Sequence, residues 1–324
     1  MDWSRWISGA MLAILLLGSV VTTGAQGDLS ANDKAAIAAA QAAFEGFGTA
    51  QTYEADVKFR NISEIRMTLD GVTYVIQQQD TLKGPCAFRR VPGNTYDDQF
   101  LSLENQVEQK VIALGETKEA ENEPVMIELV VVDDEIYLRG EAEDGPLGRT
   151  ADDWLPITGL PSSRVLVDYL LRLSGEYGQH NYLRLLSVVT AVEVSEPAVE
   201  GGDLQVEYRF TLDPEQALAV LGVKALTGHY LDNWMTVDVP TMVNTIYSDP
   251  DTRMYLEVTL GVEDHALRKA SIRTISDIVL DVGEAGGSTG LAGTEMRINQ
   301  DIRHTLTVRT LNERVEIEAP DLFE

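Results

Sequence analysis

A long alternation of apolar and polar residues over residues 53–69 constrains the fold of this chain more than any other feature. Odd positions are mostly apolar and even positions mostly charged, which predicts a β-strand with one face toward the core. Asp70-Gly71 follows as a two-residue hairpin turn, and residues 72–79 return as its partner strand. Three residues break the alternation: Asn61, Ile62 and Ser63.

The same period of two returns in the second half of the chain, over residues 204–212, 253–262 and 297–309. In the last of these runs the apolar face also carries Gln300 and His304. A further short strand is expected over residues 315–319. Strands with one wet face are typical of antiparallel sheets, whereas parallel sheets use continuous apolar runs. The pattern therefore argues against a Rossmann-type or TIM-barrel fold.

Helices are predicted between these strands. Residues 32–48 are rich in alanine, with Asn32 as the expected N-cap. Residues 161–178 carry an apolar stripe at helical spacing. Its members are Leu166, Tyr169, Leu170, Leu173 and Tyr177. Another helix starts at Asp213 as N-cap with Pro214 in the first helical position.

Loops are expected over residues 84–105, 141–161 and 283–293, and residues 232–251 fit no element. No linker is long enough to divide the chain. We therefore expect one α+β domain over residues 26–324.

The N-terminus has the layout of a secretory signal peptide over residues 1–25. Arg5 precedes an apolar run at residues 7–21, and the small residues Thr23 and Ala25 suit cleavage after Ala25. The run is short for a membrane span, which needs about 20 residues, although an uncleaved N-terminal anchor is the alternative. Either way, the protein is expected to work outside the cytoplasmic membrane.

The formal net charge of −27 makes nucleic acid an unsuitable partner because both surfaces would be negative. The single cysteine, Cys86, excludes an internal disulfide and is expected to be a buried thiol. The four histidines lack metal-ligand spacing. They are His180, His229, His265 and His304.

No motif of a common catalytic class is present. The sequence has no G-x-S-x-G, no S-x-x-K, no phosphate-binding loop and no EF-hand. Acidic turns at residues 141–145 and 247–253 are expected to be solvated loops, with calcium binding as the alternative. We therefore expect no enzyme activity, no cofactor and no metal.

The order of elements carries a resemblance. A secretion signal and a helix precede long strands, then "DDEIYLRG…DDWLPI", an amphipathic helix, "EGGDLQVEYRFTLD" and "LGVEDHALRKASI". This order resembles the LppX/LprG-type lipoproteins and, more distantly, the LolA-like lipoprotein carriers, over most of residues 33–324. Tyr137 and Trp154 match the tyrosine and tryptophan of one family hairpin. The lipidated cysteine that usually follows the signal in that group is missing, because the site reads "TTGAQG".

The resemblance implies a strongly curved antiparallel half-barrel sheet, with helices packed on its concave face around an apolar cavity. It also implies extracytoplasmic transport of a lipid or acylated ligand, with a membrane or envelope protein as a possible partner. The candidate cavity wall is Val57, Phe59, Met67, Leu166, Leu170, Leu173, Tyr208, Phe210, Leu256 and Val258. The candidate rim is Trp154 and Trp234. The alternative is a protein-interaction or sensing module at the envelope with the same fold and no ligand cavity.

Overall fold

The computed structural model describes residues 29–69, 71–121, 123–140, 151–158, 182–221, 239–281 and 295–321. In these residues, one open antiparallel sheet holds thirteen strands in the order β7-β6-β5-β3-β2-β1-β13-β12-β11-β10-β8, with β4 beside β3 and β9 beside β10. The strands are β1 Thr52–Leu69, β2 Val72–Arg89, β3 Asp98–Ala113, β4 Glu116–Glu121, β5 Val125–Val132, β6 Glu135–Gly140, β7 Ala151–Pro156, β8 Val189–Val194, β9 Ala198–Glu200, β10 Asp203–Leu212, β11 Arg253–Gly261, β12 Leu267–Asp281 and β13 Glu295–Leu311.

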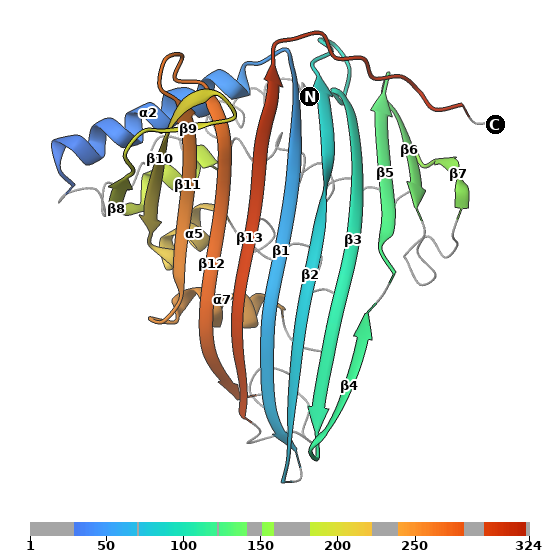
Figure 1. The fold of residues 1–324 in the computed structure, drawn as a ribbon, viewed down its shortest axis with the longest axis vertical. Helices are drawn as coiled ribbons and strands as arrows, with labels where there is room; N and C mark the ends of the chain where they lie inside the picture. Colours follow the sequence, from blue (N-terminus) through green and yellow to red (C-terminus); the bar gives the residue numbers. More distant parts are fainter. Residues whose placement is uncertain are drawn as a thin grey trace, which may run out of the picture.

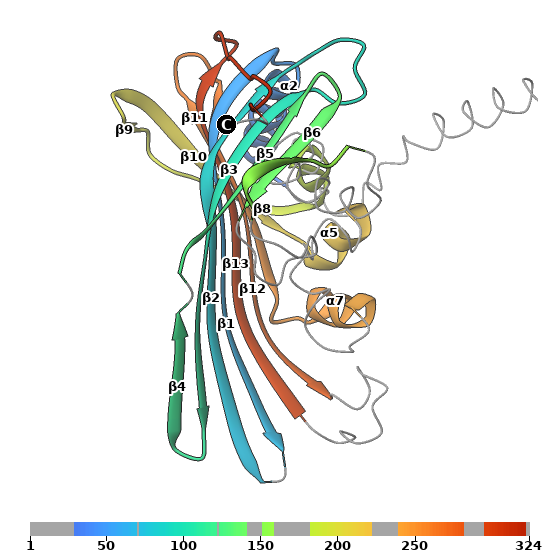
Figure 2. The same ribbon diagram turned by 90° about the vertical axis from the view of Figure 1, so that its right-hand side faces the viewer.

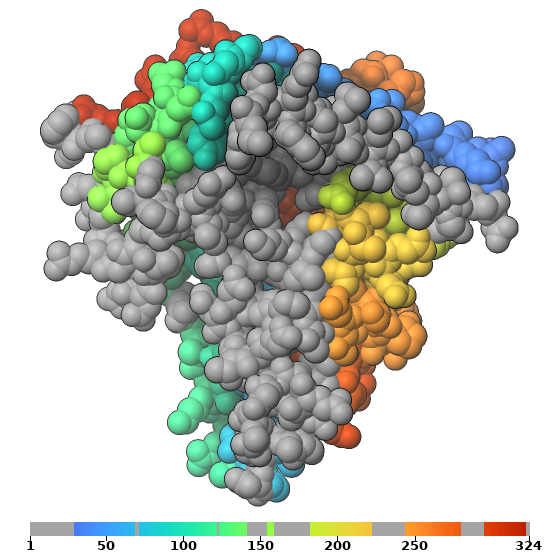
Figure 3. All heavy atoms as spheres, turned by 180° about the vertical axis from the view of Figure 1, so that it is seen from behind, coloured from blue at the N-terminus to red at the C-terminus, as the bar shows by residue number. Residues whose placement is uncertain are grey.

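The sheet is strongly curved, and the described helices lie on its concave side (Figures 1 and 2). These helices are α2 (Ala31–Gly48), α5 (Pro214–Leu221) and α7 (Val239–Ser248), and a short 3-10 turn, η2, spans Leu186–Val188. Helix α2 packs against β8, β11 and β12, while α5 and α7 pack against each other. Figure 3 shows α5 (yellow) and α7 (orange) next to each other on the face seen from behind. The predicted fold, an α+β curved antiparallel sheet with helices on its concave face, is confirmed.

The long alternating run forms β1, and its pairing with β2 confirms the predicted hairpin. Leu69 pairs with Val72 across the turn, and Gly71 has a φ of +76°, which glycine adopts without strain. A second hairpin joins β5 to β6 and turns at Asp133 and Asp134, whose φ values are +52° and +63°. Short aspartate side chains tolerate this left-handed region.

The loop expected over residues 84–105 is wrong, because β2 continues to Arg89 and β3 begins at Asp98. Gly84-Pro85 reads as a turn in the sequence, yet it lies within β2. A Cβ at Gly84 would lie 1.8 Å from the carbonyl oxygen of Ser102, so glycine lets the backbone of β3 approach closely. The pairing of β2 with β3 skips Gly84 and Pro85, where proline has no N–H to donate.

Helix starts follow the capping chemistry of the sequence, with one shift. Helix α2 is capped by Ser30 and not by Asn32: the Asp33 N–H donates to Ser30 Oγ at 3.1 Å and the Ser30 N–H donates to Asp33 Oδ2 at 2.9 Å. Helix α5 is capped as predicted, because the Gln216 N–H donates to Asp213 Oδ1 at 3.0 Å. The helix predicted over residues 161–178 lies outside the described residues.

An aromatic stack joins α2 to the sheet at one end of the core. Phe44 stacks on Tyr182 with ring centroids 4.9 Å apart, and Phe47 lies 4.7 Å from Tyr53. Tyr53 in turn stacks on Phe88 at 4.9 Å. The Cys86 thiol is buried beside this stack, as predicted, and burial raises its pKa to about 12.

The strand expected over residues 315–319 is also wrong. After β13, Asn312 turns the chain with a φ of +58°, and the C-terminal segment then crosses the end of the sheet in extended form (Figure 1). Val315 and Ile317 pack on Val130 and Val132, whose side chains lie on the convex face. The apolar alternation of this segment therefore reflects a packed extended tail.

Candidate functional site

The concave face of the sheet gathers the candidate wall residues that the structure describes. The β1–β13, β11–β12 and β10–β11 registers place them on one face. Phe210, Leu256 and Val258 have no exposed surface, and Val57 is 3% exposed. Phe59, Met67 and Tyr208 are half-buried against the same core. Leu166, Leu170, Leu173 and Trp234 lie outside the described residues.

Trp154, the other candidate rim residue, lies on the convex face instead. The Arg139 guanidinium lies 4.8 Å from the centre of its ring, a cation–π geometry. Its other neighbours are Val130 and Val132 together with the C-terminal segment. The structure therefore separates Trp154 from the residues of the concave face.

A band of polar side chains crosses the concave face between two apolar zones. It runs over β3, β2, β1, β13 and β12, because neighbouring strands place polar residues opposite one another. We define this polar band as Gln109, Gln78, Asp80, Asn61, Ser63, Gln300, Thr274 and Ser276. Asp80 is fully buried, and Ser276 is 1% exposed.

Hydrogen bonds connect the polar band around the Asp80 carboxylate. Gln78 Nε2 donates to both carboxylate oxygens at 2.9 Å, and Asn61 Nδ2 donates to Oδ2 at 3.2 Å. Gln300 Nε2 donates to Asn61 Oδ1 at 3.1 Å, and Gln109 Nε2 reaches Gln78 Oε1 at 3.5 Å. The described donors to the carboxylate are therefore neutral amides, Gln78 on the same strand and Asn61 on the neighbouring strand β1.

The environment of Asp80 disfavours its negative charge. Burial raises the pKa of its carboxyl above the ordinary value of 3.8, and the hydrogen bonds from Gln78 and Asn61 only partly oppose this effect. Among the described residues, no lysine or arginine forms an ion pair with Asp80. The band thus combines a buried carboxyl group with amide and hydroxyl groups.

Helix α7 reaches the polar band through Tyr247. Burial raises the pKa of the Tyr247 hydroxyl to about 12, although a hydrogen bond with Thr274 lowers it. Tyr247 is itself 6% exposed. This contact places α7 directly over the β12 side of the band.

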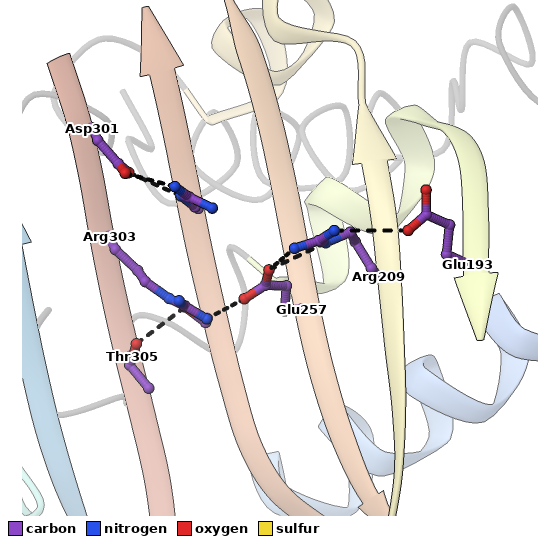
Figure 4. A network of polar contacts seen from close by, with 8 residues as sticks. Glu193, Arg209, Glu257, Asp301, Arg303 and Thr305 are labelled. Atoms are coloured by element: carbon purple, nitrogen blue, oxygen red, sulfur yellow. Dashed lines mark hydrogen bonds and ion pairs between the residues drawn. The ribbon is translucent and has the colours of Figure 1, made fainter. Parts of the chain in front are cut away.

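The convex face carries charges that are paired with one another (Figure 4). Glu257 lies between two arginines: Arg209 Nη2 donates to it at 3.0 Å, and Arg303 donates to its other oxygen. Glu193 lies 3.7 Å from Arg209, and Arg273 pairs with Asp301 at 2.6 Å. The hydrogen bond to Glu257 raises the pKa of the Arg209 guanidinium.

The described residues bear on the expectations for a metal site, for the histidines and for a membrane span. No cluster of three histidine, cysteine, aspartate or glutamate side chains there could hold a metal ion. His304 lies on the concave face opposite Phe59 and Ile272, and His265 lies in a turn. None of the described helices is long and apolar enough to span a bilayer.

Part of the polar band was visible in the sequence. Asn61 and Ser63 interrupt the alternation of β1, and Gln300 lies on the apolar face of β13. Gln78 and Asp80 were missed, because three consecutive glutamines at residues 77–79 hide which positions face inward. Only the pairing of β2 with β1 shows that Gln78 and Asp80 share the face of Ser63 and Asn61.

Comparison with known proteins returns structures but no family. No family model matches the chain, and no curated protein matches its sequence. A solved structure of Mycobacterium tuberculosis lipoprotein LppX is 14% identical with a TM-score of 0.35, covering 88% of this chain and 100% of LppX. LprF from Mycobacterium bovis is 11% identical with a TM-score of 0.36, covering 89% and 97%.

An outer membrane lipoprotein-sorting domain from Vibrio parahaemolyticus is 9% identical with a TM-score of 0.17, covering 87% of this chain and 93% of that domain. The comparison thus returns lipoproteins of the kind that the sequence resembles. Similarity at this level says nothing about function, which has to come from the residues of the chain itself.

Proposed function

We propose that this protein is a non-catalytic carrier that binds a lipid or acyl chain along the concave face of its sheet, outside the cytoplasmic membrane. The observation that carries the proposal is the apolar surface on that face, which continues on both sides of the polar band. Val57, Phe59 and Leu82 lie on one side of the band, and Ile65 and Ile298 lie on the other. The proposal places an acyl chain along this direction.

The length and chemistry of the face suit such a ligand. β1 has 18 residues, which corresponds to about 60 Å at about 3.3 Å per residue. Each methylene group transferred from water to an apolar environment gains about 0.8 kcal/mol. A long chain is therefore held by area alone, so the absence of a catalytic motif from the sequence is consistent with this role.

The proposed wall consists of the described concave residues together with three leucines of the predicted helix at residues 161–178. The described members are Val57, Phe59, Met67, Tyr208, Phe210, Leu256 and Val258. The half-buried side chains Phe59, Met67 and Tyr208 are the members best placed to gain burial from a ligand. Residues 1–25 would direct export as a signal peptide or hold the protein at the membrane as an anchor, close to a lipid donor or an envelope partner.

Native mass spectrometry tests the proposal on protein purified without harsh detergent. The expected result is a stoichiometric adduct of lipid mass that organic extraction removes and added lipid restores. A matched pair of variants locates it: Phe59→Asp places a charge on the concave face, whereas Arg60→Asp changes the next residue, which is exposed on the convex face. Phe59→Asp should abolish the adduct and Arg60→Asp should retain it. A clean apo mass with no uptake of offered lipids would refute the proposal.

The second candidate is an interaction or sensing module without a ligand cavity. The complete burial of Phe210, Leu256 and Val258 favours it, because side chains with no exposed surface already have protein neighbours on every side. An adduct-free protein that still captures a specific envelope protein would support this candidate.

A further inference from the structure

The polar band places polar side chains between apolar rows of the concave face, where their burial is unfavourable. Transfer of an amide or hydroxyl group out of water is unfavourable unless a hydrogen bond compensates. The rows on either side of the band are largely apolar, with Phe59 and Leu82 before it and Ile65, Ile76 and Ile298 after it. A face that bound only hydrocarbon would not need polar side chains at these positions.

The one ionisable group of the band, Asp80, becomes negative when it ionises and has no described counter-charge. The Asp80 carboxylate accepts hydrogen bonds from Gln78 and Asn61, which are neutral. The other members are amides and hydroxyls, namely Gln109, Ser63, Gln300, Thr274 and Ser276. A phosphate or carboxylate brought to this place would meet a like charge in a region of low polarity, where repulsion is stronger than in water.

An open hydrogen-bond acceptor lies next to the band. Asn105 on β3 shares the concave face and pairs with Leu82, one row from Asp80. Its Oδ1 atom is buried and has no hydrogen-bond partner in the described part of the chain. Buried acceptors are usually satisfied in native structures, so this one points to a donor supplied from outside the chain. A ligand hydroxyl or N–H would satisfy it.

We infer that the concave face selects an uncharged lipid whose hydroxyl-bearing polar group lies at the polar band, and that Asp80 and Asn105 determine this selection. The inference rests on the proposed lipid-carrier function. Asp80 disfavours anionic headgroups by charge, and Asn105 accepts a hydrogen bond from the ligand. The alkyl part of the ligand then lies along the apolar rows beside the band.

A different role of the same band is purely structural. Hydrogen bonds between Asn61, Asp80 and Gln300 join β2, β1 and β13 and could fix the register of these long strands. That role predicts that changes in the band alter stability and leave ligand preference untouched. It also leaves the open acceptor of Asn105 unexplained.

The test compares two lipids that share their acyl chains and differ in the headgroup. Delipidated full-length protein is titrated with dipalmitoylglycerol, which has a free hydroxyl, and with dipalmitoyl phosphatidic acid, which is anionic. Wild-type protein should prefer dipalmitoylglycerol by at least about tenfold, which corresponds to about 1.4 kcal/mol. Asp80→Asn should reduce this preference severalfold by admitting phosphatidic acid.

Two further variants keep the test decisive. Asp277→Asn removes the same charge on the convex face and should leave the preference unchanged. Asn105→Leu removes the open acceptor and should weaken dipalmitoylglycerol binding about tenfold with little effect on phosphatidic acid, even if Asp80→Asn fails to fold.

The outcomes separate the two proposals. Wild-type protein that binds both lipids equally, or an Asn105→Leu variant with wild-type affinities, would overturn the inference and leave the carrier function standing. Wild-type protein that binds neither lipid, nor any other offered, would overturn the carrier function and the inference with it.

Discussion

The two faces of the sheet each bury a carboxylate, and they do so in opposite ways. On the convex face, Glu257 lies between Arg209 and Arg303 and is 6% exposed. On the concave face, Asp80 is fully buried and its described partners are the amides of Gln78 and Asn61. Two arginines neutralise the carboxylate on the convex face, whereas no described residue supplies a counter-charge to Asp80 on the concave face.

The difference indicates what each face is for. Charge-assisted hydrogen bonds join β10, β11 and β13 on the convex face, so its buried carboxylate is paired (Figure 4). Among the described residues of the concave face, Asp80 has a raised pKa and no cationic partner, and Asn105 Oδ1 has no hydrogen-bond donor. Ionisable groups with perturbed pKa values are more typical of binding sites than of purely structural regions.

The largest expected effect comes from the apolar part of the concave face. Phe210→Ala should lower the free energy of unfolding by about 3–5 kcal/mol, because a fully buried ring is lost and a cavity remains. Thr211→Ala, the next residue on the convex side, should cost about 0.5 kcal/mol or less. Urea unfolding followed by circular dichroism measures both. Similar costs for the two variants would contradict the assignment of the core to one face.

The paired carboxylate should come next. Glu257→Gln keeps the size of the side chain but removes a charge that two arginines share, so we expect a loss of about 1.5–3 kcal/mol. Glu207→Gln, exposed on the convex side of β10, is the matched control and should change little. The same unfolding measurement compares them, and an equal loss in both variants would show that Glu257 is not specially placed.

Asp80, which has no described counter-charge, should make the free energy of unfolding depend on pH. Because burial raises the folded-state pKa of Asp80, its protonated form favours the fold. This contribution is fully present below the ordinary pKa of 3.8 and is lost as pH rises through the raised value. The stability of wild type relative to Asp80→Asn should therefore fall as pH rises across that window. A difference that is constant from acid to neutral pH would argue against an uncompensated charge.

The exposed ion pair on the convex face should have the smallest effect. Arg297 holds the Asp277 carboxylate at 2.6 and 2.8 Å, and this hydrogen bond lowers the pKa of Asp277. Both groups face water, where such pairs contribute little and are screened by salt. Asp277→Asn should leave the urea midpoint unchanged within error at physiological salt. A clear shift of the urea midpoint would mean that the ion pairs of the convex face stabilise the fold cooperatively.

Local signals in the sequence predicted much of the framework. The alternation of residues 53–69 predicted β1, Gly71 predicted its turn, and Asp213 predicted the start of α5. Side-chain period, turn geometry and capping depend on neighbours in the chain, so they can be read there. The loop predicted from Gly84 onward was wrong because the strand conformation there depends on a distant segment. Ser102 of β3 approaches the backbone at Gly84 closely.

The sequence by itself determined that long strands would carry one apolar and one polar face, and that Asn61, Ser63 and Gln300 would be exceptions on the apolar one. Only the tertiary structure decided that these exceptions meet Gln78 and Asp80 in one band. It also decided that Trp154 lies under the C-terminal segment on the convex face. The physical reason is that strand register and sheet curvature arise from pairing between distant segments, and no local pattern encodes which residues they bring together.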